Sequence, residues 1–357
     1  MTRLASPILK MPSPRRWETE AEGLVTILDA GASESGSTDA RPLVVMLVGP
    51  TAVGKTDVSL QLARALDAEI VSVDSRLFYR GMDVGTAKPT PDERKQIPHH
   101  LIDLVEPDET LSLADFRMHA QRAIEGIISR GRLPLLVGGT GQYIQAVRSG
   151  WNPPAVSANE RLRNELQRLA VARGTAWLHE RLAAMDPESA HKIDSRNLRR
   201  TIRAMEVTML TGRRFSEQRG TGETMYRILS IGLRRSRSEL YARIDARIDS
   251  MLQRGMLEET RRLLARGLAP SLPAFSAIGY SQCIQVLHGE MDLREARMLM
   301  QRRTREFVRR QSTWFKESDP GIQWFDAARP DLIEAVSTLI NQARSDTIVT
   351  TKPAGAV

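Results

Sequence analysis

Cysteine is almost absent from this chain, which has a single thiol, Cys283, in 357 residues. One cysteine cannot form an internal disulfide or a cysteine-based zinc cluster, so a disulfide-stabilised secreted scaffold and a zinc finger are both excluded. Cys283 is expected to be a small buried hydrophobic side chain. No run of about 18 apolar residues occurs either, which excludes a membrane-spanning helix.

Acidic residues are the smaller of the two charged groups. The chain has 51 Lys and Arg against 43 Asp and Glu, a formal net charge of +8. An excess of positive charge is typical of proteins with polyanionic partners, although by itself it is a weak indication. The hydrophobic share of 41% is sufficient for a substantial core, and the length allows two or three domains.

Residues 1–40 are rich in Ser, Pro, Gly and Ala and have no sustained periodicity. Such a composition predicts a disordered N-terminal extension, and residues 342–357 are predicted to form a disordered tail. Continuous apolar runs at Leu43–Val48, Glu69–Val73 and Leu133–Val137 are typical of buried parallel strands. Helical patterns near Asp57–Leu66 and Ala114–Ser129 separate these strands, which indicates a parallel α/β sheet.

The pattern changes after Gly150. From about residue 159 to residue 214 it is helical throughout, with many arginines. One more strand is predicted at Tyr226–Leu233, followed by a long helical pattern over Ser238–Arg266 and an arginine-rich helix from about Leu293 to Phe315. The α/β pattern is therefore interrupted by a helical segment and then resumes.

A phosphate-binding motif lies between the first predicted strand and the first predicted helix. It matches G-x-x-x-x-G-K-[ST] in full at Gly49, Pro50, Thr51, Ala52, Val53, Gly54, Lys55 and Thr56. The glycines allow backbone N–H groups to surround a phosphate, and the helix N-terminus adds partial positive charge. Lys55 would place its charge on the phosphates, and the Thr56 hydroxyl would ligate Mg²⁺, the cofactor that we expect. We predict an α/β fold with a P-loop NTPase-like parallel sheet core, residues 41–150 and 225–330, and an all-helical insertion domain, residues 151–224.

Asp74 directly follows the strand predicted at Glu69–Val73. The carboxyl ends of parallel strands are where open α/β sheets bind their ligands. In nucleotide-binding proteins with a phosphate loop, an acid at such a position holds Mg²⁺, whereas an Asp after a strand is ordinarily a helix cap or a turn residue. Because Asp74 would face the phosphate loop, we favour a functional role.

Several longer strings resemble the tRNA dimethylallyltransferase family, also called tRNA isopentenyltransferases. Besides Gly49–Thr56 and Ser72–Ser75, the resemblance is carried by Tyr79–Pro89 (YRGMDVGTAKP), Pro98–Asp103, Leu136–Gly141, Arg203–Val207, Ala277–Tyr280 and Gln311–Phe315. The match is collinear from about Leu43 to Trp324, close to four fifths of the chain, and GMDVGTAKP is its most specific part. No C-terminal Cys₂His₂ finger is present, so the resemblance is to the bacterial type.

This resemblance implies an alkyl transfer. The family moves a dimethylallyl group from dimethylallyl diphosphate to N6 of the adenosine next to the 3′ side of the anticodon (A37), in tRNAs that read codons beginning with U, and releases pyrophosphate. The phosphate loop would then hold a diphosphate leaving group. Asp74 matches the family's general base, Thr140 matches a threonine near the reacting centre, and Arg247 matches the arginine that binds the diphosphate.

Arg243 lies four residues before Arg247, on the same face of a predicted helix, and is assigned to the diphosphate with it. The alternative is a solvated helix face on which both arginines pair with Asp245 and Asp249. His99 and His100 are adjacent in an extended segment and therefore point in different directions, so we interpret them as structural or substrate-lining residues and not as metal ligands.

The RNA side of the prediction also follows from the resemblance. An adenine stacked in an anticodon loop must be turned out before its N6 can reach a buried diphosphate. The residues that match tRNA-contacting stretches of the family are Asp74, Ser75, Arg76, Leu77, Arg199, Arg200, Thr201, Ile202, Arg203, Ser276, Ala277, Ile278, Gly279, Tyr280 and Ser281, together with Arg163 when a one-residue gap is allowed. Ser281 stands where the family often has Lys or Arg, so one RNA contact is replaced or lost. The basic segment Arg297–Lys316 is a further candidate for phosphate contacts.

Three other functions remain open at this point: a small-molecule kinase with ATP in the loop, an adenylate isopentenyltransferase that alkylates a free nucleotide, and a tRNA-binding protein without activity. The basic insertion and the matches at Thr140 and Arg247 disfavour the kinase, and the basic insertion with the Arg199–Arg203 cluster disfavours the adenylate isopentenyltransferase. An intact Lys55, Thr56 and Asp74 disfavour the third function. We expect a cytoplasmic monomer whose partners are a tRNA anticodon stem-loop and dimethylallyl diphosphate, with no membrane partner.

Overall fold

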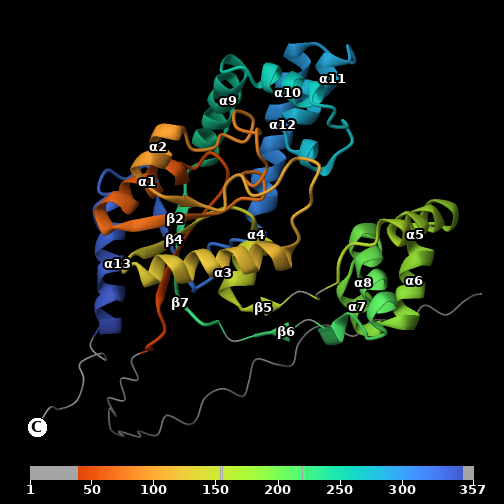
Figure 1. The fold of residues 1–357 in the computed structure, drawn as a ribbon, viewed down its shortest axis with the longest axis horizontal. Coiled ribbons are helices and arrows are strands. Elements are labelled where there is room, and N and C mark those ends of the chain that lie inside the picture. The colour runs from red at the N-terminus through yellow and green to blue at the C-terminus, as the bar shows by residue number, and fades with distance from the viewer. Residues whose placement is uncertain (1–38, 153, 155, 219, 223, 349–357) are drawn as a thin grey trace, which may run out of the picture. The chain divides into compact units, whose positions relative to one another are not determined.

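The computed structural model describes residues 39–152, 154, 156–218, 220–222 and 224–348 (Figure 1). The predicted N-terminal extension, residues 1–40, lies outside the described residues except for its last two. The predicted disordered tail, residues 342–357, is wrong for residues 342–348, which belong to helix α13 (Leu332–Ile348). That helix is held by Val336 and Ile340, which are fully buried in the core, and residues 349–357 lie outside the described residues.

A six-stranded parallel sheet forms the core, in the order β3-β2-β4-β1-β7-β8. Its strands are β1 (Leu43–Val48), β2 (Ala68–Val73), β3 (His99–His100), β4 (Leu133–Gly138), β7 (Arg227–Arg234) and β8 (Ile322–Asp326). Strand β1 is central and buried along its whole length, with β4 on one side and β7 on the other. The segment that follows β1 therefore emerges in the middle of the sheet edge, where open parallel sheets bind ligands.

The two faces of the sheet are covered by different helices. Alternate residues of β1 point to opposite faces, so Val45 and Leu47 pack with α1 (Lys55–Leu66) and α13, whereas Val44 and Met46 pack with α3 (Leu113–Ser129) and α4 (Gly141–Arg148). Both sets of contacts are fully buried. The α/β class and the P-loop type of fold predicted from the sequence are confirmed.

Two edge strands are not predicted by the sequence pattern. Strands β3 and β8 are short and only partly buried, so they lack the continuous apolar run that identifies a central strand. The long helical pattern over Ser238–Arg266 forms two helices, α9 (Arg237–Gln253) and α10 (Met256–Ala265). Gly255, with a φ of 90°, separates them because a glycine readily ends a helix in this conformation. The remaining elements of the core are α2 (Pro91–Gln96), the 3₁₀ turn η2 (Pro273–Ser276), α11 (Tyr280–Leu287) and α12 (Leu293–Gln311).

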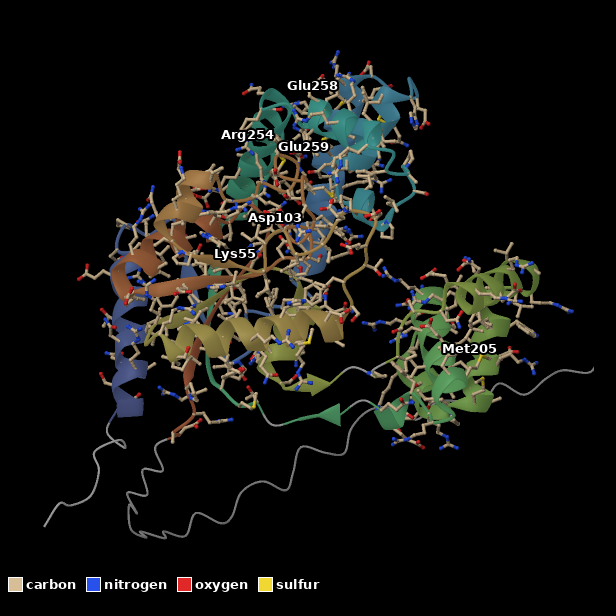
Figure 2. All side chains as sticks on the ribbon, viewed as in Figure 1. Lys55, Asp103, Met205, Arg254, Glu258 and Glu259 are labelled. Carbon is tan, nitrogen blue, oxygen red and sulfur yellow. The ribbon has the colours of Figure 1, made fainter. Side chains whose placement is uncertain are left out.

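The helical insertion has a hydrophobic cluster of its own. Helices α5 (Glu160–Arg173), α6 (Thr175–Met185), α7 (Pro187–Lys192) and α8 (Leu198–Thr211) contribute to it Leu166, Leu178, Leu182, Ala190 and Met205. Met205 is labelled in Figure 2. The 3₁₀ turn η1 (Ser216–Gln218) follows α8, and the short strands β5 (Trp151–Asn152) and β6 (Gly220–Thr221) pair antiparallel at the two ends of the insertion. In the part of the chain that the structure describes, none of the helices combines the length and apolar character needed to cross a bilayer.

Candidate active site

The phosphate loop owes its shape to three residues with positive φ. Gly49 has a φ of 148°, and a Cβ atom there would lie 2.6 Å from the carbonyl oxygen of Leu233 on β7, so only glycine fits. Ala52 and Gly54 have φ values of 67° and 109°, and Gly54 is the N-cap of α1. The loop is therefore a tight turn that delivers the chain directly into the N-terminus of a helix, the arrangement that binds phosphates.

Three side chains from distant segments hold this loop. The backbone N–H of Thr51 donates to Oε1 of Gln311 (2.9 Å) at the end of α12. Arg235 Nε donates to the carbonyl of Val53 (3.0 Å), and Arg243 Nε donates to the carbonyl of Ala52 (2.7 Å). The Lys55 ammonium group lies 2.9 Å from the carbonyl oxygens of both Gly49 and Pro50. Hydrogen bonds from α12, from the segment after β7 and from α9 thus fix the conformation of the loop.

Asp74, Lys55 and Arg247 form one charged cluster at the end of the sheet. Burial is the main reason why the pKa of Lys55 is lowered to about 8, while the nearby Asp74 carboxylate opposes the shift and Arg247 adds to it. Burial also lowers the pKa of Arg247, again against the effect of Asp74. Two cations beside one carboxylate leave an excess of positive charge, which suits a diphosphate.

Thr140 lies next to Asp74 because β2 and β4 are neighbours whose last residues, Val73 and Gly138, are paired in register. A Cβ atom on Gly138 would lie 2.3 Å from the carbonyl oxygen of Val73, so the two strands approach closely at this point. The Thr140 hydroxyl accepts a long hydrogen bond from the backbone N–H of Ser75 (3.5 Å). The structure therefore brings together Lys55, Asp74, Thr140 and Arg247, as predicted from the sequence.

The alternative interpretation of Arg243 and Arg247 as an ion-paired surface face does not hold. Asp245 pairs with Arg305 (2.7 Å) and Asp249 pairs with Arg297 (2.5 Å), and both partners belong to α12. Arg243 instead contacts the phosphate loop, and Arg247 donates to the carbonyl of Thr86 (3.3 Å). Both arginines are thereby directed toward the loops around the cluster.

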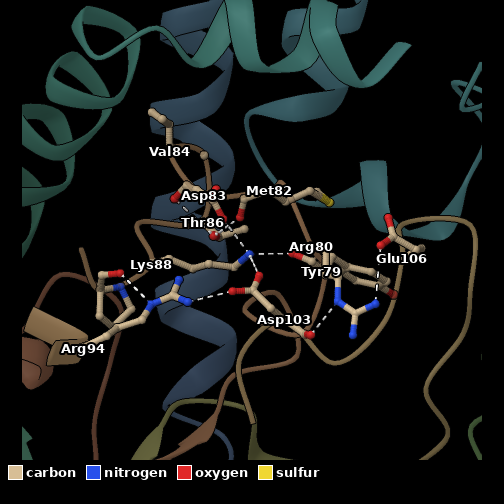
Figure 3. A network of polar contacts seen from close by, with 12 residues as sticks. Tyr79, Arg80, Met82, Asp83, Val84, Thr86, Lys88, Arg94, Asp103 and Glu106 are labelled. Carbon is tan, nitrogen blue, oxygen red and sulfur yellow. Dashed lines mark hydrogen bonds and ion pairs between the residues drawn. The ribbon is translucent and has the colours of Figure 1, made fainter. Parts of the chain in front are cut away.

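The segment GMDVGTAKP is a loop stabilised by a buried lysine (Figure 3). The Lys88 ammonium group donates to the carbonyl of Tyr79 (2.5 Å) and to the carboxylates of Asp83 (2.7 Å) and Asp103 (2.5 Å). Asp103 also pairs with Arg94 (2.7 Å). This network shapes the loop whose Thr86 carbonyl accepts the hydrogen bond from Arg247, a supporting role that the motif alone does not reveal.

Two segments that were predicted to contact tRNA lie beside each other. The Arg76 guanidinium group donates to the hydroxyl of Ser276 (3.2 Å) and to the carbonyl of Pro273 (3.4 Å). The backbone N–H of Arg76 donates to Asp74 Oδ1 (3.0 Å). Ser276 is exposed, Ser75, Arg76, Leu77, Ile278 and Ser281 are half-buried, and Ala277, Gly279 and Tyr280 are buried. The surface that these segments offer to a ligand is therefore formed mainly by their exposed and half-buried members.

The predicted contacts on the insertion also differ in exposure. Arg199 and Arg200 are exposed in the first turn of α8, whereas Thr201 and Ile202 are buried. Arg163 and Arg203 both pair with the fully buried Glu206, at 2.9 and 2.6 Å. Arg163 thus connects α5 to α8, whereas Arg203 pairs with Glu206 within α8 and donates to the carbonyl of Val156 (3.0 Å). Among the described residues, Arg199 and Arg200 are the members of this set whose guanidinium groups have no protein partner.

The two adjacent histidines have structural partners. His100 Nε2 lies 2.6 Å from Glu69 Oε2, and His99 Nδ1 donates to the carbonyl of Ile97 (2.7 Å). Against the effect of burial, hydrogen bonds from Arg130 and His100 hold the pKa of Glu69 at about 2. Among the described residues, no group of three or more His, Cys, Asp or Glu side chains is arranged to hold a metal ion. Cys283 is buried, as expected from the sequence.

The amino-acid sequence alone indicates no role for Gln311, Arg235 or Glu259. Gln311 occurs in one of the strings that carry the resemblance, but nothing in the string indicates that its side chain reaches the phosphate loop. Arg235 lies between a predicted strand and a predicted helix, and Glu259 lies within that helical pattern; at both places a charged residue is ordinarily solvated. Only the folded chain brings these three side chains to the loops around the site.

Two protein-family models match the chain. The model described as IPP transferase matches residues 77–318, which include the helical insertion, and the model described as Isopentenyl transferase matches residues 42–105. A protein of Roseiflexus sp. (strain RS-1) named tRNA dimethylallyltransferase is 47% identical over 84% of this chain and 98% of its own length. One of Thermomicrobium roseum with the same name is 43% identical over 85% of this chain and 92% of its own length.

Solved structures give the same result. The full-length tRNA isopentenylpyrophosphate transferase of Bacillus halodurans is 39% identical, with a TM-score of 0.65 over 87% of this chain and all of that chain. A eukaryotic dimethylallyltransferase whose structures show it acting on tRNA is 25% identical, with a TM-score of 0.69 over 87% of this chain and 80% of that chain.

Proposed function

The chain belongs to the IPP transferase family, and from this membership we propose that it transfers a dimethylallyl group from dimethylallyl diphosphate to a tRNA. It is a prenyl transferase, and its acceptor is proposed to be N6 of the adenosine next to the 3′ side of the anticodon, in tRNAs that read codons beginning with U. The observation that carries the proposal is the cluster of Lys55, Asp74 and Arg247 beside the phosphate loop.

The phosphate loop and its neighbouring cations would hold the diphosphate. Lys55 lies at the start of α1 and Arg247 on α9, and Arg243 is fixed against the loop by its hydrogen bond to the carbonyl of Ala52. As the bond between the allylic carbon and oxygen breaks, negative charge accumulates on the departing pyrophosphate. Cations that are already in place stabilise this charge without reorganisation, which lowers the barrier.

Asp74 is proposed to accept the proton that N6 loses. An adenine amine is a weak nucleophile because its lone pair is delocalised into the ring, so removal of its proton as the new bond forms assists the attack. Asp74 is half-buried at the end of β2, and one of its oxygens accepts the N–H of Arg76. The Thr140 hydroxyl lies on the adjacent strand end and would orient the acceptor.

Mg²⁺ is proposed as the cofactor, with Thr56 as its protein ligand. Thr56 is exposed at the start of α1, directly after Lys55. Mg²⁺ commonly takes one or two protein oxygens and completes its coordination with substrate phosphates and water, so a single hydroxyl beside a diphosphate is compatible with it. When bound, the ion would supply further neutralisation of the charge on pyrophosphate.

The acceptor RNA is proposed to contact exposed cations on the insertion and on α12. Arg199 and Arg200 are exposed on α8, and Arg303 and Arg309 are exposed on α12. Contacts to phosphates from such groups give affinity without sequence information. Selection of one adenosine would then depend on the residues around Asp74, including Arg76 and Ser276.

A competition between acceptors tests the proposal. Purified protein is mixed with Mg²⁺, labelled dimethylallyl diphosphate, an anticodon stem-loop and free AMP, and the label is followed in each acceptor. Label in the RNA alone is expected. Label in AMP would indicate an adenylate isopentenyltransferase. Label in neither acceptor, together with transfer of phosphate in a parallel reaction that contains ATP, would indicate a kinase.

A further inference from the structure

Glu259 is a buried carboxylate that binds four donors from two other segments. It lies on α10 and is only 3% exposed (Figure 2). Its Oε2 accepts the backbone N–H groups of Asp83 (3.0 Å) and Val84 (2.8 Å). Its Oε1 accepts the N–H of Gly85 (3.1 Å) and the hydroxyl of Tyr280 (2.6 Å). Glu259 forms no ion pair with any described residue, so these four hydrogen bonds are its stabilising contacts.

Three consecutive N–H groups directed at one carboxylate define the shape of the loop that contains them. The loop is also packed tightly here, because a Cβ atom on Gly85 would lie 2.5 Å from Met256 and 2.6 Å from the ring of Tyr280. The other end of the loop is fixed by Lys88, which binds Asp83 and Asp103 (Figure 3). Thr86 lies between these two anchors.

The position of Thr86 matters because its carbonyl accepts the hydrogen bond from Arg247. Arg247 also lies close enough to Asp74 and Lys55 for their charges to interact. A displacement of residues 83–86 would therefore move the hydrogen-bond acceptor that directs the Arg247 guanidinium group.

The fourth donor connects the carboxylate to a different part of the site. Tyr280 is fully buried and begins α11, and the segment 276–281 that contains it contacts Arg76 through Ser276. Burial and the Glu259 carboxylate both raise the pKa of Tyr280, so its hydroxyl remains a donor over the whole working pH range. Glu259 thus joins the loop that contacts Arg247 to the segment that contacts Arg76, whose backbone N–H donates to Asp74.

We infer that Glu259 is a positioning residue, which holds residues 83–85 so that the Thr86 carbonyl directs Arg247 toward the diphosphate. This inference rests on the proposed function. It assigns to Glu259 no contact with either substrate: the carboxylate acts through the loop and through Arg247.

The test compares Glu259→Gln with Glu258→Gln, two adjacent residues of α10 that are both labelled in Figure 2. Glu258 has a side chain that is 58% exposed and pairs with the surface residue Arg261, so it serves as the matched control. In Glu259→Gln an amide NH₂ group faces backbone donors. We expect a rise of about tenfold in the KM for dimethylallyl diphosphate and in the Kd for inorganic pyrophosphate, with tRNA affinity within about twofold of wild type.

A double-mutant cycle that combines Glu259→Gln with Arg247→Ala distinguishes a positioning role from a purely structural one. If Glu259 acts through Arg247, then Glu259→Gln in an Arg247→Ala background should change the Kd for pyrophosphate by less than about twofold. Equal effects of Glu259→Gln in both backgrounds, or wild-type pyrophosphate affinity in the single variant, would overturn the inference. Should Glu259→Gln fail to fold, Tyr280→Phe removes one of the four hydrogen bonds, and the same cycle with Arg247→Ala decides the question.

Pyrophosphate binding also separates this inference from the proposed function. A wild-type protein that binds pyrophosphate but transfers no dimethylallyl group would contradict the function and leave the positioning role testable by binding alone. If the wild-type protein is active and Glu259→Gln is equally active with an unchanged KM, only the positioning role is contradicted.

Discussion

Gln311 and Thr51 are separated by 260 positions in the sequence, and the Gln311 side chain accepts a 2.9 Å hydrogen bond from the Thr51 N–H. The same amide group donates to the carbonyl of Gly139 (3.2 Å), one residue before Thr140. A Cβ atom on Gly139 would lie 2.4 Å from this amide nitrogen, so the fit is close. One buried side chain at the end of α12 therefore holds the phosphate loop and the Thr140 loop at a fixed separation.

Replacement of Gln311 by Leu should loosen both loops. A buried carbonyl, that of Gly139, and a half-buried N–H, that of Thr51, would lose their partner. We expect this to lower the free energy of unfolding by about 1–3 kcal/mol and to raise the KM for dimethylallyl diphosphate. Thermal unfolding and steady-state kinetics measure the two effects. Ser312→Ala, an exposed neighbour, is the control, and a Gln311→Leu variant with control-like KM would contradict this bridging role.

Diphosphate binding should weaken as the pH rises. The pKa of Lys55 is lowered to about 8, so its ammonium group is largely protonated at pH 7 and largely neutral at pH 9. Pyrophosphate affinity, measured by calorimetry between these values, should therefore fall relative to that of Lys55→Arg, whose guanidinium group stays charged. Because pyrophosphate titrates equally in both experiments, its own protonation cancels when the affinities of the two proteins are compared. Parallel pH profiles would show that Lys55 does not titrate in this range.

Loss of the Asp74 carboxylate should affect chemistry more than binding. In Asp74→Ala we expect turnover to fall about a hundredfold or more, the range for loss of a general base, with tRNA affinity nearly unchanged. Asp92→Ala removes a carboxylate from the surface of α2, where it pairs with Lys95, and should retain full turnover. Full activity of Asp74→Ala would refute its assignment as the base.

Exposed arginines of the insertion should contribute to RNA affinity alone. Arg199→Ala with Arg200→Ala should weaken stem-loop binding and reduce its dependence on salt, since each lost phosphate contact reduces counterion release. The KM for dimethylallyl diphosphate should not change. Arg163→Ala is the contrasting variant: it removes a partner of the buried Glu206 and should lower the melting temperature. An unchanged salt dependence in the double variant would exclude these two contacts.

The sequence predicts the central strands of the sheet well, but the edge strands and the C-terminal helix poorly. Strands β1, β2 and β4 are identified by their largely apolar runs, because a strand covered on both faces has no polar side. Strand β7, with its more mixed sequence, is also predicted. The edge strand β8 and the end of α13 are missed, since half-buried elements carry mixed sequences that resemble loops.

The same distinction applies to the site. Lys55, Asp74, Thr140 and Arg247 are found because each belongs to a motif or follows a strand at the edge that binds ligands. Glu259 and Gln311 contact backbone groups, which any sequence provides, so no pairing of residue types reveals them before the chain is folded. Residues such as Arg163 and Tyr280 match motifs of the family, yet their side chains are engaged within the protein.

The most direct test of the account is a single-turnover reaction with a stem-loop that has adenosine next to the 3′ side of the anticodon, followed by digestion of the RNA to nucleosides. The account predicts one dimethylallyl group on N6 of that adenosine and one pyrophosphate released for each group transferred. It also predicts no reaction when guanosine replaces the adenosine. Transfer to any other position, or release of pyrophosphate without modified RNA, would contradict it.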